Sequence, residues 1–177
     1  TITGSGAMSG DTCAWIDHKD EVTSVVFNGD ITSISANAFA QNTNLTSVTI
    51  PSTVTSLGRR AFAECTNLKT VVFPDGLREI GVSAFYNCTS LPSVELGEEL
   101  MYIRDSAFAN CTALTTMIIN SDLVLIDDSA TTLPENLNQI KGHQYTGAYY
   151  YARQNGIKFV DINTAEEFTG TITNQDY

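Results

Sequence analysis

The sequence of 177 residues predicts a repeat solenoid of α/β type, built from about five 23-residue coils with short parallel strands and capped at both ends. The pair Ala-Phe recurs at this interval, at Ala38-Phe39, Ala61-Phe62, Ala84-Phe85 and Ala107-Phe108. Cysteine keeps the same interval at Cys65, Cys88 and Cys111. Two residue types that hold one register over several units indicate an internal repeat.

The apolar positions of the unit are mostly leucine, valine and isoleucine, which makes it a leucine-rich repeat. They comprise Leu45, Leu68, Leu91 and Leu114; Val48, Val71, Val94 and Met117; Val54, Leu77, Leu100 and Leu123; and Leu57, Ile80, Ile103 and Ile126. A unit of this size has one apolar edge that it cannot bury alone. Neighbouring units must therefore stack and share a continuous core.

Each unit is expected to contribute one short strand. Apolar and polar residues alternate at the end of segment 45–50, which is typical of a strand, and Pro51 then stops it. In stacked coils these strands align as one parallel sheet. Segment 54–58 is expected to turn the chain, and the Ala-Phe-x-x-Cys segment is too short for more than about one helical turn.

The terminal coils need caps, because an open coil would expose its core. We expect an N-terminal cap over residues 1–21, the solenoid over 22–136, a C-terminal cap over 137–162, and a tail or linker over 163–177. Trp15 is the expected N-terminal lid. In the C-terminal cap, residues 147–155 predict a short helix, Gly156 suits a left-handed helix end, and residues 157–160 predict a final strand.

Composition excludes two classes of partner. Apolar residues make up 42% of the chain and charged residues 16%, which is typical of a folded protein. The net charge of -11 repels phosphate backbones and anionic lipid headgroups, so we expect no nucleic-acid partner. No stretch approaches the roughly 18 apolar residues of a membrane span, so we expect no direct membrane insertion.

These repeats resemble the BspA-like leucine-rich-repeat family of bacterial surface proteins. The family unit runs approximately Leu-x-x-Val-x-Ile-Pro-x-x-Val-x-x-Ile-Gly-x-x-Ala-Phe-x-x-Cys, and the match covers about residues 22–130. The resemblance implies a secreted or cell-surface location and, since members are described as adhesins, binding of host matrix or plasma proteins. It carries over no catalytic residue. Gly97 and Arg104 stand where the family has Pro and Gly, and we expect a locally loosened turn there.

The cysteine interval does not indicate a metal site. Zinc ligands usually come in pairs two to four residues apart, whereas Cys65, Cys88 and Cys111 follow the coil. We interpret them as a ladder of buried thiols. Cys13 lies outside the ladder, and the sequence leaves open whether it is free or paired.

The other reactive side chains do not form a recognisable catalytic pattern either. The two histidines, His18 and His143, fall in opposite caps, which separates them from a common triad. Acidic residues at the turns comprise Glu98, Glu99, Asp122, Asp127 and Asp128. They lack the alternating order of a calcium loop and are interpreted as a solvated edge. We therefore expect no catalytic residues, no metal and no cofactor.

Two surfaces are candidates for binding. The outward row of the expected sheet comprises Ser47, Thr49, Thr70, Val72, Ser93, Glu95, Thr116 and Ile118. A candidate basic patch comprises Arg59, Arg60, Lys69 and Arg78. The alternative for the row is that strands merely favour such residues, and the alternative for the patch is a solvated face.

The sequence supports three hypotheses about function. The first is an extracellular bacterial binding or adhesion module that recognises a protein or glycan, such as a host matrix protein, without catalysis. The second is a structural spacer or display stalk, since the chain begins at Thr1 without Met and we expect a longer parent protein. The third is an enzyme with a site in the C-terminal cap near His143 and Tyr145. The oligomeric state stays open.

Overall fold

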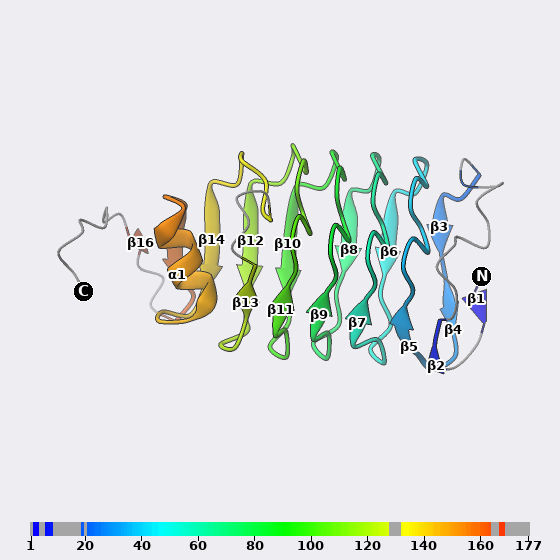
Figure 1. Ribbon diagram of the computed structural model, residues 1–177, viewed down its shortest axis with the longest axis horizontal. Coiled ribbons are helices and arrows are strands. Elements are labelled where there is room, and N and C mark those ends of the chain that lie inside the picture. The colour runs from blue at the N-terminus through cyan, green and yellow to red at the C-terminus, as the bar shows by residue number, and fades with distance from the viewer. Residues whose placement is uncertain are drawn as a thin grey trace.

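The computed structural model describes residues 2–3, 6–8, 19, 21–127, 132–163 and 167–168. Over these residues the coils lie side by side along one long axis, with α1 at one end and β1 at the other (Figure 1). The predicted solenoid of 23-residue coils is confirmed. Long strands begin at residues 24, 47, 70, 93, 116 and 139, so there are six coils and not five.

The longer strands pair in parallel through equivalent residues of successive coils. One sheet contains β3 (Ser24–Val25), β6 (Ser47–Thr49) and β8 (Thr70–Val72); a second contains β10 (Ser93–Leu96), β12 (Thr116–Ile119), β14 (Gln139–Gly142), β15 (Lys158–Asp161) and the antiparallel β16 (Glu167–Phe168). We call the surface that these two sheets share the long-strand face. Within it, Val48 pairs with Val71, and Met117 pairs with Ile140.

A second set of parallel strands covers the other face, so the expectation of a single sheet is wrong. The short-strand face contains β2 (Gly6–Ala7), β5 (Ile31–Ile34), β7 (Ser56–Leu57), β9 (Glu79–Ile80), β11 (Tyr102–Ile103) and β13 (Leu125–Ile126). The segment expected only to turn the chain thus forms a strand. Two residues suffice for β7, β9 and β11, because each of these inner strands pairs with both neighbours. A further pair joins β1 (Ile2–Thr3) to β4 (Phe27–Asn28).

The phenylalanine of each Ala-Phe pair lies in the core and stacks on its equivalent in the next coil. Ring centroids of Phe39 and Phe62, Phe62 and Phe85, and Phe85 and Phe108 are 5.0, 5.3 and 5.2 Å apart, and the rings are parallel to within 9°. All four rings are fully buried. The Ala-Phe segments themselves form turns, and α1 is the only helix in the described part of the chain.

The ladder cysteines are buried free thiols, as the interpretation of their spacing predicted. Each also donates a hydrogen bond to the preceding coil. The Sγ atoms of Cys65, Cys88 and Cys111 lie 3.1, 3.2 and 3.1 Å from the carbonyl oxygens of Phe39, Phe62 and Phe85. Burial raises the pKa of the Cys88 thiol well above its usual range. Cys13 lies outside the described residues.

Helix α1 (Gly147–Gln154) covers the C-terminal end of the core. The Thr146 hydroxyl accepts a hydrogen bond from the Tyr149 N–H and caps the helix, and Gly156 adopts a φ of 67° at its other end. The ring of Tyr149 packs edge-on against Phe159 of β15, with centroids 5.2 Å apart. Because β14 pairs with β12 and β15, the sheet runs past residue 136 into the segment expected to be cap.

At the C-terminal end of the repeat, the expectation that Leu123 lies in the core is wrong. Leu123, expected inside, is 72% exposed, and Val124 is buried in its place. The turn after β12 holds one more residue, while the pairing of Ile103 with Ile126 restores the register. The expected lid Trp15 lies outside the described residues.

Replacement of Phe85 by Ala should lower the free energy of unfolding by about 3–5 kcal/mol, because it removes a ring held between two others and leaves a cavity. Chemical denaturation checks this value. Val82→Ala, at a partly exposed side chain in the same coil, serves as the control and should change stability much less. An equal effect of both substitutions would contradict the stacked core.

Native-state labelling of a Cys13→Ser variant with a small thiol reagent should be slow at Cys65, Cys88 and Cys111. Burial hides the three thiols, and the raised pKa of Cys88 keeps it protonated at neutral pH. Labelling should become complete when the protein is unfolded in denaturant. Rapid labelling before unfolding would show that the ladder is accessible.

Candidate binding face

The predicted outward row lies on the long-strand face and points to solvent. Ser47, Thr49, Thr70 and Val72 are exposed, and Val48 between them is buried. Ser93 and Glu95 are exposed as well, whereas Thr116 and Ile118 are half-buried. The strand pairing sets Ser47 beside Thr70 and Glu95 beside Ile118. The structure thus brings the row together within each of the two sheets.

The row extends further than the sequence indicated. Ser24 pairs with Ser47 at one end, and Gln139 and Lys141 pair with Thr116 and Ile118 at the other. Ser24 belongs to a coil with Asn42 in place of the cysteine, and Gln139 and Lys141 follow Thr131 and Pro134, which replace the phenylalanine and the cysteine, so the repeat signal is weaker in both coils. Counting 23 residues from Thr116 would have located them.

The row is interrupted between β8 and β10. Both strands are edges of their sheets, although they lie next to each other in the stack (Figure 1). On the short-strand face the ladder runs without a break past the same coils, from β7 through β9 to β11. The interruption therefore concerns one face of the solenoid only.

Pro92 removes the first hydrogen bond at the interruption. Residues at the equivalent position donate a backbone N–H to a carbonyl oxygen of the preceding coil, namely Thr46, Lys69, Thr115 and Asn138, over 3.3, 2.9, 3.2 and 3.2 Å. Pro92 stands at this position in the coil of β10 and has no N–H to donate. The first hydrogen bond of the ladder between β8 and β10 is therefore impossible.

A cleft of about 220 Å³ opens where the two edges face each other. It is lined by Val71, Val72, Phe73, Asp75, Glu95, Gly97 and Asn120. Val71 is half-buried here, whereas the equivalent Val48 and Val94 are buried. Phe73 is likewise half-buried, and its ring meets Phe85 edge-on at 5.5 Å. The cleft thus gives solvent access to side chains that other coils enclose.

The turn at Gly97 is tight and not loosened, contrary to expectation. A Cβ atom on Gly97 would lie 2.5 Å from the Cα of Asp75, so the two coils touch through their backbones. The Glu99 N–H also donates to the Asp75 carbonyl oxygen at 3.2 Å. Only glycine permits this approach, and Gly97 and Asp75 both line the cleft.

Arg104, the other departure from the family pattern, is also firmly held. Its Nε donates to Glu79 Oε1 at 2.7 Å, and its guanidinium lies 4.2 Å from the centre of the Tyr102 ring. The hydrogen bond that Arg104 donates to Glu79 raises the pKa of Arg104 above its usual value. This contact joins two neighbouring coils.

The candidate basic patch is spread over both faces. Arg59 and Arg60 follow β7 on the short-strand face, Arg78 precedes β9 there, and Lys69 precedes β8 on the long-strand face. Arg60 forms an ion pair with Glu64, and Arg78 Nη2 lies 3.0 Å from Glu99 Oε2. Two of the four cations are thus neutralised within the chain.

The acidic edge forms no cluster of three or more metal-ligand side chains among the described residues. Glu99 pairs with Arg78, and Asp127 accepts the Asp105 N–H at 3.0 Å. Asp128 and His18 lie outside the described residues. Asp122 Oδ1 lies 2.6 Å from His143 Nδ1.

An open hollow of about 660 Å³ lies beside His143 and includes Tyr145 and Asp161. The Thr146 hydroxyl in this hollow donates to the His143 carbonyl oxygen at 2.7 Å and caps α1, so it serves the helix end. Asp161 Oδ1 accepts the Asn163 N–H at 2.9 Å. These contacts hold the cap together. The groups described here do not form a hydrogen-bonded chain of nucleophile, base and orienting group.

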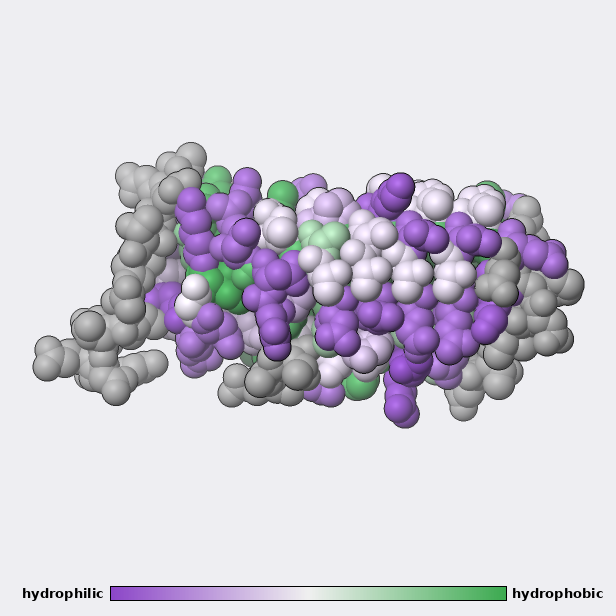
Figure 2. Space-filling view, turned by 90° about the horizontal axis from the view of Figure 1, so that it is seen from above, coloured by the Kyte–Doolittle hydropathy of each residue, from purple (hydrophilic) through white to green (hydrophobic). Residues whose placement is uncertain are grey.

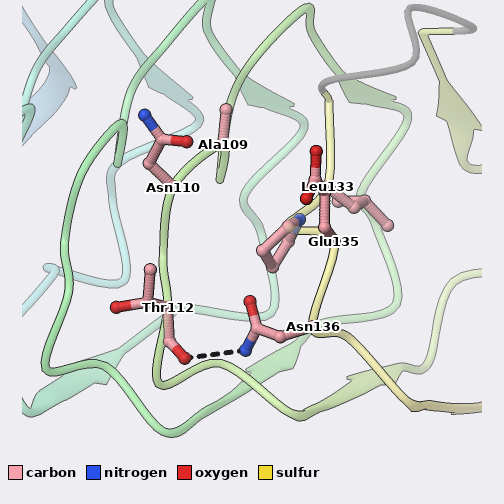
Figure 3. Close-up of a pocket in the computed structure, with 7 residues that line it drawn as sticks. Ala109, Asn110, Thr112, Leu133, Glu135 and Asn136 are labelled. Atoms are coloured by element: carbon pink, nitrogen blue, oxygen red, sulfur yellow. Dashed lines mark hydrogen bonds between the residues drawn. The ribbon is translucent and has the colours of Figure 1, made fainter.

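A third hollow, of about 300 Å³, lies between the last two coils (Figure 3). Asn136 crosses its edge and donates to the Thr112 carbonyl oxygen at 2.8 Å. The segment leading into it, residues 128–131, is outside the described residues, so we assign it no role.

The edge seen from above carries polar and weakly polar residues in rows along the long axis, and green residues gather toward the C-terminal end (Figure 2). The rows follow from the repeat, because each coil places the same position at the same height. No helix in the described residues has the length and apolarity of a membrane span.

Stacked 23-residue coils with two strand faces define a leucine-rich-repeat solenoid. The sequence profile of the BspA type leucine rich repeat region matches residues 17–138 in six copies. The chain belongs to this family. A comparison with curated proteins found no match.

Two solved structures are similar in both sequence and fold. A leucine-rich repeat protein from Eubacterium ventriosum is 30% identical, with a TM-score of 0.70 over 80% of this chain and 39% of its own. A leucine rich cell surface protein from Faecalibacterium prausnitzii is 30% identical, with a TM-score of 0.65 over 74% of this chain and 34% of its own. This chain spans less than half the length of either protein.

Substitution of Gly97 by Ala should destabilise the protein by roughly 1–3 kcal/mol, because the new Cβ would collide with the Asp75 backbone. Gly76→Ala is the matched control, since its Cβ would lie at an ordinary 3.6 Å from the Ser52 oxygen. That substitution should be neutral or stabilise by up to about 1 kcal/mol. Thermal denaturation of both variants measures the difference, and equal midpoints would contradict the close approach.

Proposed function

We propose that this chain is a non-catalytic binding module of a bacterial cell-surface or secreted protein, and that it recognises a protein or glycan through the long-strand face. The family membership and the cell surface protein among its structural neighbours support the location. The observation that carries the binding role is the outward row, which repeats in register along two sheets.

The composition of the row suits recognition of an extended macromolecule. Ser47, Thr49 and Thr70 offer hydroxyl groups with little side-chain entropy to lose on binding. Val72 is 50% exposed and adds an apolar contact at the centre of the row. Since the chain carries a net charge of -11, a basic partner is favoured by long-range attraction.

A structural spacer remains the alternative, because the chain spans only part of its structural relatives. A spacer needs the stacked core but not the outward row. Substitutions in the row that leave the core intact therefore separate the two functions. We propose no catalysis in the C-terminal cap, since the Thr146 hydroxyl, the Asp161 carboxylate and the His143 imidazole each already have a partner within the chain.

Purified host matrix and plasma proteins and a glycan array should be screened against the isolated chain, and any ligand titrated against variants. The double substitution Thr49→Lys and Thr116→Lys should weaken binding about tenfold or more, because two long cations enter the row. Stability should change by less than about 0.5 kcal/mol per site, because Thr49 is exposed and Thr116 half-buried.

Thr32→Lys is the matched control, since Thr32 is an exposed threonine on the short-strand face. It should leave the affinity unchanged. A ligand whose binding ignores the double substitution but is lost in Arg59→Glu with Arg60→Glu would assign recognition to the basic residues. The absence of any ligand in the screen would favour the spacer.

A further inference from the structure

We propose that the cleft between β8 and β10 is a subsite for one basic side chain, lysine or arginine, of a polypeptide bound to the long-strand face. The inference rests on the proposed function and names the chemistry of its partner. It is carried by the interrupted ladder, the volume of the cleft and the carboxylates at its rim.

The size of the cleft limits the occupant to a single side chain. Small-molecule sites usually enclose about 300–1,000 Å³, whereas this cleft measures about 220 Å³. It opens directly onto the outward row, since Val72 and Glu95 belong to both. A chain lying along the row would therefore pass over the opening and could insert one residue.

The walls select an occupant with an apolar stem. Val71, Val72 and Phe73 form one side, and these apolar side chains are accessible along the edge of β8 that has no paired strand. An aliphatic stem packed on them removes apolar surface from water. The methylene groups of lysine and arginine provide such a stem.

The rim selects a positive head group. Asp75 and Glu95 line the opening, and among the described residues neither carboxylate has an ion pair or a side-chain hydrogen bond. Asn120 adds a side-chain amide as a third polar group. Glu99, by contrast, is already paired with Arg78. A cation entering the cleft would thus meet two carboxylates that no group of this chain neutralises.

Unpaired backbone groups of the two edge strands offer the partner further hydrogen bonds at the cleft. Each of β8 and β10 has one side without a strand partner, so backbone groups face the cleft. An inserted ammonium or guanidinium group can donate hydrogen bonds to such carbonyl oxygens as well as to the carboxylates. A neutral apolar side chain of the same length would satisfy none of them.

The test is an NMR titration of the ¹⁵N-labelled chain with acetylated and amidated pentapeptides, Gly-Gly-Lys-Gly-Gly and Gly-Gly-Arg-Gly-Gly. The amides of Val71, Val72, Phe73 and Glu95 should shift. A norleucine peptide, which has the same stem as lysine but no charge, should bind at least about threefold more weakly. Shifts spread over the acidic surface, or equal binding of norleucine, would overturn the proposal.

Two variants locate the effect. Glu95→Gln with Asp75→Asn should weaken the lysine peptide by roughly fivefold, which is the range of exposed ion pairs. Glu135→Gln, an exposed glutamate in another hollow, is the control and should not change the affinity. Pro92→Thr restores an N–H, so it should close the cleft and abolish the shifts. In this variant, protection of the backbone amide at position 92 from hydrogen exchange would verify that the cleft has closed. Unchanged peptide binding by the closed variant would refute the subsite.

The peptide titration is independent of any macromolecular ligand. If a ligand found in the screen depends on Thr49 and Thr116 but ignores Pro92→Thr and Glu95→Gln, the binding face stands and the subsite fails. If the peptides bind at the cleft while no ligand depends on the row, the subsite stands and the proposed function fails.

Discussion

The whole molecule depends on one constraint, the close contact between equivalent residues of successive coils. Phenylalanine rings stack at 5.0 to 5.3 Å, which is close to the roughly 4.8 Å spacing of paired strands. A coil cannot bury its apolar edge by itself, so each residue is stabilised by its own copy in the next coil. The thiol of each ladder cysteine adds a hydrogen bond across the same gap.

Because of this constraint, a single residue that differs from the repeat pattern also changes contacts of the neighbouring coil. Pro92 leaves no donor for the carbonyl group of residue 69, and farther along the same unpaired edge an apolar wall that the other coils enclose is accessible. Gly97 acts in the opposite direction, since the missing side chain lets its backbone touch Asp75. Arg104 replaces a small residue and joins its coil to the previous one through Glu79.

The features that recur every 23 residues could be predicted from the sequence, whereas features that depend on contacts between one coil and the next could not. The 23-residue register located the phenylalanine stack, the thiol ladder and the outward row. The short-strand face was missed because two residues are too few to show alternation. Pro92 lies in a coil of normal pattern, and its effect appears only when the N–H groups of Lys69 and Thr115 are compared. Leu123 and Val124 are both apolar, so the pattern alone could not choose between them.

Repetition and departure would serve recognition in different ways. A periodic row such as the one containing Ser47 and Thr70 binds an extended ligand equally well after a shift by one coil, so by itself it cannot define a register. Five coils have a preceding neighbour, and Pro92 is the one residue at the equivalent position of these coils that donates no backbone N–H to it. A basic side chain held between Val72 and Glu95 would therefore fix the register of the ligand, while the row supplies contact area on either side.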